Sequence, residues 1–157
     1  MKFIFLLFSH GAVLGIGFAL GVYFLPILTA PKSANLSQIE QVVANPVYKA
    51  EFKKGQRGND FFHWGEGQLV ITNNEIALKG KVAPGPDYKI YLTKKFVEHE
   101  DEFLPIKQNA LYVADLKVFE NFIVPLDKKI NFEDYNTIII WCESFKEFIT
   151  SAKYKSL

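Results

Sequence analysis

The chain has 157 residues, of which 49% are apolar and 22% are charged, and its formal net charge is +1. This length suits about one domain, and this composition excludes a disordered or collagen-like chain. After Pro46 the chain has 16 basic and 16 acidic residues. It therefore lacks the basic excess that phosphate contacts require, and we expect no nucleic-acid partner. The single cysteine, Cys142, excludes an intrachain disulfide framework and a zinc site built from several thiolates.

The first 30 residues predict a membrane anchor. Of the 28 residues from Phe3 to Ala30, 20 are apolar and none is Asp, Glu, Lys or Arg. A helix needs about 20 apolar residues to cross a bilayer, whereas the apolar part of a cleavable signal peptide has about 7 to 15. The tripeptide Leu28-Thr29-Ala30 is a poor cleavage signal. We therefore expect residues 1–30 to be an uncleaved signal-anchor; removal of this segment is the alternative.

Charge at the start of the chain predicts the orientation of this anchor. Lys2 and the terminal amine precede the helix and favour the cytoplasmic side. The C-terminal part of this single-pass protein is then expected in the periplasm or outside the cell. Helix–helix association is also expected, because small residues four positions apart let two membrane helices approach closely. Two such pairs are present, Gly11 with Gly15 and Gly17 with Gly21.

Residues 31–46 predict a linker that contains a short helix. Ser37 and Glu40 have the spacing of a capping box, which satisfies free N–H groups at the start of a helix. Pro46 would end that helix, because proline cannot continue the hydrogen-bond ladder. We expect this segment to act as a spacer that holds the folded domain away from the bilayer.

From Val47 onward the apolar residues alternate with a period of two, which indicates short antiparallel strands. The acidic segment Glu98–Glu102 is expected to be a solvated loop. Seven or eight strands in about 110 residues are typical of a β-sandwich or a small barrel, and we predict a sandwich for residues 47–157. The strands are expected at Val47–Phe52, Gln68–Thr72, Glu75–Val82, Tyr88–Thr93, Leu111–Asp115, Asn121–Leu126, Thr137–Glu143 and Phe145–Tyr154.

The strand that begins at Thr137 is apolar on both faces, which predicts a central strand covered on both sides. Cys142 lies near its end. Alternation places the cysteine on the same side as Ile138 and Ile140, and opposite Trp141. A lone buried cysteine is ordinarily a small hydrophobic residue without chemistry.

Four segments of the chain form an ordered set of motifs. They are His63-Trp64-Gly65-Glu66-Gly67, then Gly85 to Leu92, then Leu116-Lys117 with Glu120 to Pro125, and finally Tyr135 through Trp141-Cys142 to Phe145 and Ala152. The most specific elements are Gly-Pro-Asp-x-x-x-Tyr-Leu and Trp-Cys-x-x-Phe, taken together. In this order the segments resemble the DM-thirteen domain family, whose members are proposed to transfer electrons, and the resemblance covers about residues 52–154.

This resemblance implies a β-sandwich in which Cys142 has the redox role, either as a bare thiol or as a ligand to a group such as haem. His63 is the second candidate ligand, because a thiolate and an imidazole both serve as axial ligands of haem iron. A covalent Cys-x-x-Cys-His attachment is absent from the sequence. The sequence leaves open whether a cofactor binds at all and whether the protein is an enzyme.

Two functions follow from the sequence. In the first, a membrane-anchored extracytoplasmic domain transfers electrons or relays thiol oxidation through Cys142, with a membrane or extracytoplasmic redox protein as partner. In the second, the domain is a non-catalytic interaction or structural module tethered to the membrane, and Cys142 is a core residue.

Overall fold

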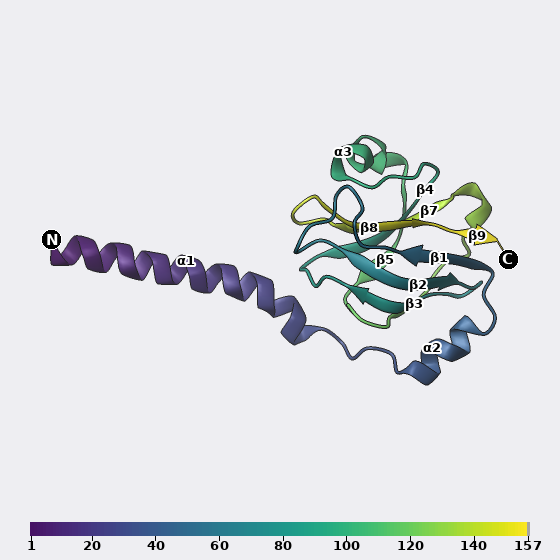
Figure 1. Ribbon diagram of the computed structural model, residues 1–157, viewed down its shortest axis with the longest axis horizontal. Coiled ribbons are helices and arrows are strands. Elements are labelled where there is room, and N and C mark those ends of the chain that lie inside the picture. The colour runs from purple at the N-terminus through teal and green to yellow at the C-terminus, as the bar shows by residue number, and fades with distance from the viewer. Residues whose placement is uncertain (157) are drawn as a thin grey trace.

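A long helix, a short linker helix and a β-sandwich follow one another along the chain (Figure 1). The structure is a computed structural model, and it describes residues 1–156. Helix α1 (Lys2–Thr29) extends away from the sandwich, and none of its residues is buried. It is long and apolar enough to cross a membrane. At about 1.5 Å per residue the helix is about 42 Å long, which exceeds the roughly 30 Å of bilayer hydrocarbon.

Helix α2 (Leu36–Val43) forms where a short helix was predicted, but its cap lies earlier. The Asn35 side chain accepts a hydrogen bond from the backbone N–H of Gln38, and the Gln38 side chain accepts one from the N–H of Asn35. Ser37 and Glu40 do not form the predicted capping box. Ile39 is fully buried against the outer face of the nearby sheet, so α2 packs on the domain and is not a free spacer.

Two antiparallel sheets form the domain, which confirms the predicted sandwich. Each of the eight predicted strands is present, and a two-residue ninth strand adds to the edge of one sheet by pairing with the backbone of Tyr48 and Lys49. The five-stranded sheet has the order β6 (Ile123–Pro125), β3 (Glu75–Val82), β2 (Gly65–Ile71), β1 (Tyr48–Phe52) and β9 (Lys155–Ser156). The four-stranded sheet has the order β5 (Leu111–Leu116), β4 (Tyr88–Thr93), β7 (Thr137–Cys142) and β8 (Glu147–Lys153).

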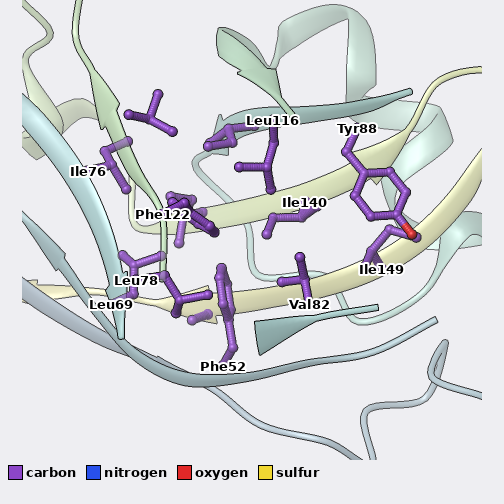
Figure 2. Close-up of a cluster of buried hydrophobic side chains, with 14 of the residues drawn as sticks. Phe52, Leu69, Ile76, Leu78, Val82, Tyr88, Leu116, Phe122, Ile140 and Ile149 are labelled. Atoms are coloured by element: carbon purple, nitrogen blue, oxygen red, sulfur yellow. The ribbon is translucent and has the colours of Figure 1, made fainter. Parts of the chain in front are cut away.

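The main core lies between the two sheets, and Figure 2 shows part of it. Tyr88 lies at one side of this cluster and Ile76 at the other. The two residues mark opposite ends of the sandwich. The labelled side chains come from both sheets and from the loops that join them: Phe52, Leu69, Ile76, Leu78, Val82, Tyr88, Leu116, Phe122, Ile140 and Ile149.

Strand β7 lies between β4 and β8 and is buried on both faces, as predicted. Cys142 belongs to the core between the sheets, together with Ile138 and Ile140. Trp141 points to the outer face, where its ring packs on Phe103 with 4.9 Å between ring centroids. The alternation read from the sequence is therefore correct for this strand.

The outer face of the four-stranded sheet is covered by a helical segment that begins within the predicted loop Glu98–Glu102. It consists of α3 (Glu100–Phe103) and the 3-10 helix η1 (Leu104–Asn109). The loop prediction was wrong because the acidic residues lie in the first turn of α3, and negative charge is favourable at a helix N-terminus. His99 caps that end by accepting a hydrogen bond from the N–H of Asp101.

Candidate functional site

A cavity of about 420 Å³ lies at the end of the sandwich that faces α1. Strand register defines this end: Gly65 pairs with Val82 in one sheet, and Tyr88 pairs with Cys142 in the other. Such a volume is within the usual range for small-molecule and cofactor pockets. Its lining includes Cys142, Tyr88, His63, Pro86 and Phe145 of the domain, together with one face of α1.

Cys142 lies at the end of β7, and only 2% of its surface is exposed. Burial raises the pKa of its thiol, and this effect outweighs the opposing effect of backbone N–H groups from Phe145, Asp87 and Ser144. The thiol is therefore neutral near pH 7. A neutral, buried thiol reacts slowly as a nucleophile, so this position does not suit the exchange of disulfides in solution.

Tyr88 is the cross-strand neighbour of Cys142 and is 3% exposed. Burial raises the pKa of its hydroxyl well above the ordinary value of 10, and the nearby Cys142 adds to this effect. The ring lies so close to Gly85 that a Cβ at that position would collide with it. Tyr88 therefore reaches the cavity only because residue 85 is glycine. In the sequence Tyr88 belongs to the Gly85 to Leu92 motif, but no local pattern marks it as a site residue.

His63 lies in the loop before β2 and lines the same cavity as Cys142. Its Nδ1 is 2.9 Å from a carboxylate oxygen of Asp60, and Asp60 also accepts hydrogen bonds from the N–H groups of Phe62 and His63. Burial alone would raise the pKa of Asp60, but these bonds to His63 and Phe62 hold it below its ordinary value. The carboxylate thus fixes the orientation of the imidazole and leaves Nε2 available to a ligand.

The turn after β7 is tied to the loop before β4. The backbone N–H of Glu143 donates to the carbonyl of Asp87 at 2.9 Å, and the Ser144 hydroxyl donates to the Asp87 carboxylate at 2.9 Å. In the sequence Asp87 belongs to the family motif, and a turn residue that bonds its own backbone is the ordinary interpretation of its position. Its role in the structure is to hold two walls of the cavity together.

The side chains around the cavity include donor types that haem iron binds. A thiol and an imidazole line one cavity, and haem iron needs only one or two protein ligands. An imidazole whose other nitrogen bonds a carboxylate is the usual arrangement of a metal-ligating histidine. Within residues 1–156 no group of three or more His, Cys, Asp or Glu side chains could hold a bare metal ion.

Helix α1 forms part of the cavity wall through an apolar stretch near its C-terminal end. The Tyr23 ring packs edge-on against Phe62 of the domain, with 5.9 Å between ring centroids. The sequence did not predict this contact, because residues 23 and 62 are far apart in the chain. The α1 residues that line the cavity are Phe18, Ala19, Val22 and Tyr23.

A family model described as Electron transfer DM13 matches residues 58–154, which include His63, Tyr88 and Cys142. No curated protein matches the chain. No solved structure matches it either.

Proposed function

Because the chain belongs to the electron transfer DM13 family, we propose that it is an electron-transfer module whose redox site is the cavity of Cys142 and His63. The observation that carries this proposal is that one cavity brings together the family cysteine and a carboxylate-bound histidine from a distant loop. We further propose that α1 tethers the module to a membrane, with its N-terminus in the cytoplasm and the sandwich on the extracytoplasmic side. The length and apolar composition of α1 support this tethering.

The residues of the site have distinct roles in this proposal. A haem bound there would supply a one-electron couple. Cys142 would bind it through sulfur after losing its proton, and its burial would keep water from the bond. His63 would bind through Nε2, with the Asp60 carboxylate holding the ring in place. The apolar lining around them would favour the bound group over solvent.

Visible absorption of the full-length protein tests this proposal. The protein is produced with haem supplied, extracted from membranes in mild detergent and compared with the variants Cys142→Ala and His63→Ala. We expect a haem band in the parent protein, loss or shift of the band in both variants, and unchanged folding by circular dichroism. Ile140→Val is the matched control: it lies on the same strand and face, should cost about 1 kcal/mol, and should keep the band.

The second function, a non-catalytic module with Cys142 as packing, is favoured by the cysteine's place in the main core. In that case the parent protein has no chromophore, and Cys142→Ala lowers the free energy of unfolding by about 1 to 2 kcal/mol, because a buried sulfur is lost. A colourless parent whose thiol resists small alkylating reagents, and whose alanine variant still passes electrons to its partner as before, would overturn the redox proposal.

A further inference from the structure

Three phenylalanines are exposed at the end of the sandwich that carries the cavity. Phe61 and Phe62 lie in the loop between β1 and β2, and Phe145 lies in the turn between β7 and β8. Their exposed fractions are 84%, 52% and 57%. We call these three residues the aromatic tip. Several large apolar side chains exposed at one place indicate a contact surface, because the exposure of apolar surface to water is unfavourable.

The aromatic tip lies beside α1. Phe62 contacts Phe61, with 5.0 Å between ring centroids, and it contacts Tyr23 of α1 on its other side. Phe145 lines the cavity together with α1 residues. In Figure 1 the loop before β2 and the turn before β8 are at the end of the domain directed toward α1.

With the charged start of α1 at one bilayer surface, the helix brings this contact to the opposite surface. If the hydrocarbon begins at Phe3, about 20 residues bring the helix to its far side near Val22. Tyr23 then lies at the lipid–water boundary, which is where tyrosine and tryptophan concentrate in membrane helices. The side chain that touches Phe62 is therefore at interfacial depth.

We propose that the aromatic tip inserts into the interfacial layer of the bilayer that α1 spans, so that the Cys142 cavity opens at the lipid surface. This inference rests on the membrane tethering proposed above. The occupant is the bilayer, because the tip is continuous with the apolar surface of the spanning helix. Apolar side chains at such a boundary are buried in the headgroup and acyl region. The electron donor or acceptor would then reach the Cys142 cavity from within the membrane.

Single tryptophans at defined positions test this proposal in the full-length protein. The protein is placed in nanodiscs of phosphatidylethanolamine and phosphatidylglycerol, with or without lipids brominated near the headgroup or deep in the chain. A Trp64→Phe background leaves only the fully buried Trp141 as a constant emitter. The test variants are Phe61→Trp and Phe145→Trp, both at exposed positions. Leu14→Trp within α1 is the positive control, and Asn73→Trp is the negative control, because the turn between β2 and β3 lies at the opposite end of the sandwich.

We expect Phe61→Trp and Phe145→Trp to lose emission with shallow bromines more than with deep ones. Leu14→Trp should lose emission mainly with deep bromines, and Asn73→Trp should lose none. Quenching of Leu14→Trp without quenching at either tip position would overturn the insertion and leave the tethering intact. Release of the parent protein from membranes by alkaline carbonate would overturn the tethering and the insertion together.

Discussion

At the scale of single residues, a close backbone approach in the five-stranded sheet depends on a pair of glycines. Gly67 of β2 pairs with Gly80 of β3, and Gly67 has φ +129°, which other residues rarely adopt. A Cβ on Gly80 would lie 2.7 Å from the Cα of Gly67 and would collide with the carbonyl of Glu66. The atoms that this Cβ would meet all belong to the backbone of Glu66 and Gly67, so no flexible side chain could move aside.

Gly80→Ala is therefore expected to lower the free energy of unfolding by about 1 to 3 kcal/mol, the usual cost of forcing extra volume into a packed site. Chemical denaturation followed by circular dichroism measures it. Lys79→Ala, one residue earlier and exposed, is the control and should change stability by less than about 0.5 kcal/mol. Equal effects of the two substitutions would show that the strands can separate locally at no cost.

At the scale of elements, α2 depends on a single buried side chain. Ile39 has no exposed surface and packs against Val70 and Ala77 on the outer face of the five-stranded sheet. A helix of eight residues is too short to be stable alone in water. Its structure therefore comes from docking, with the Asn35 cap as a local contribution.

We expect Ile39→Ala to cost about 2 kcal/mol, since truncating a buried isoleucine removes its contacts and leaves a cavity. The exposed Gln41→Ala serves as the control and should be within about 0.5 kcal/mol of the parent. Hydrogen exchange of the α2 amides should also become faster in the Ile39 variant alone. A variant as stable as the control would mean that α2 is not held by the sheet.

The 3-10 helix η1 is held to the four-stranded sheet by Glu143, which follows β7. Lys107 of η1 donates to the Glu143 carboxylate at 2.8 Å, and the hydroxyl of Tyr91 in β4 also donates to it. Burial alone would raise the pKa of Glu143, but these two bonds hold it below the ordinary value of 4.5. A carboxyl whose pKa is lowered by folding stabilises the folded state above its unfolded pKa and loses that contribution as pH falls through the folded pKa.

Glu143→Gln is thus expected to destabilise the protein at neutral pH, and its effect should shrink as the pH falls from about 5 toward about 3. Denaturation curves of both proteins across this range measure the difference. In a Lys107→Met background the substitution should cost less, because one of the two partners is already absent. A difference that stays constant down to acid pH would contradict the role of the charge.

At the scale of the whole molecule, the proposed tether predicts how the chain is processed. The apolar segment is longer than a signal peptide requires, and its end is a poor cleavage site. We expect the mature protein to stay with membranes after an alkaline wash and to keep its N-terminus. Intact-mass measurement checks the second point. A mature chain that starts near Pro31 would show that the segment is removed, and the domain would then lack a tether.

Elements whose local pattern agrees with their final environment could be predicted from the sequence. Polar and apolar residues alternate in β3, β7 is apolar on both faces, and the glycine and aromatic motifs identified the family. These features were readable because strand periodicity and burial act over a few neighbouring residues.

Which distant residues meet depends on tertiary packing. The acidic residues before Phe103 suggested a loop by their charge. They form α3 because Phe103 at the end of this segment is buried against the outer face of the four-stranded sheet. The linker helix begins at Leu36 and docks, since Ile39 finds a sheet surface that no local pattern reveals. Likewise, the cavity joins His63 to Cys142 because the register of two sheets brings their loops to one end. Such contacts are set by packing between residues far apart in the chain, and a single sequence carries no signal of which distant residues will meet.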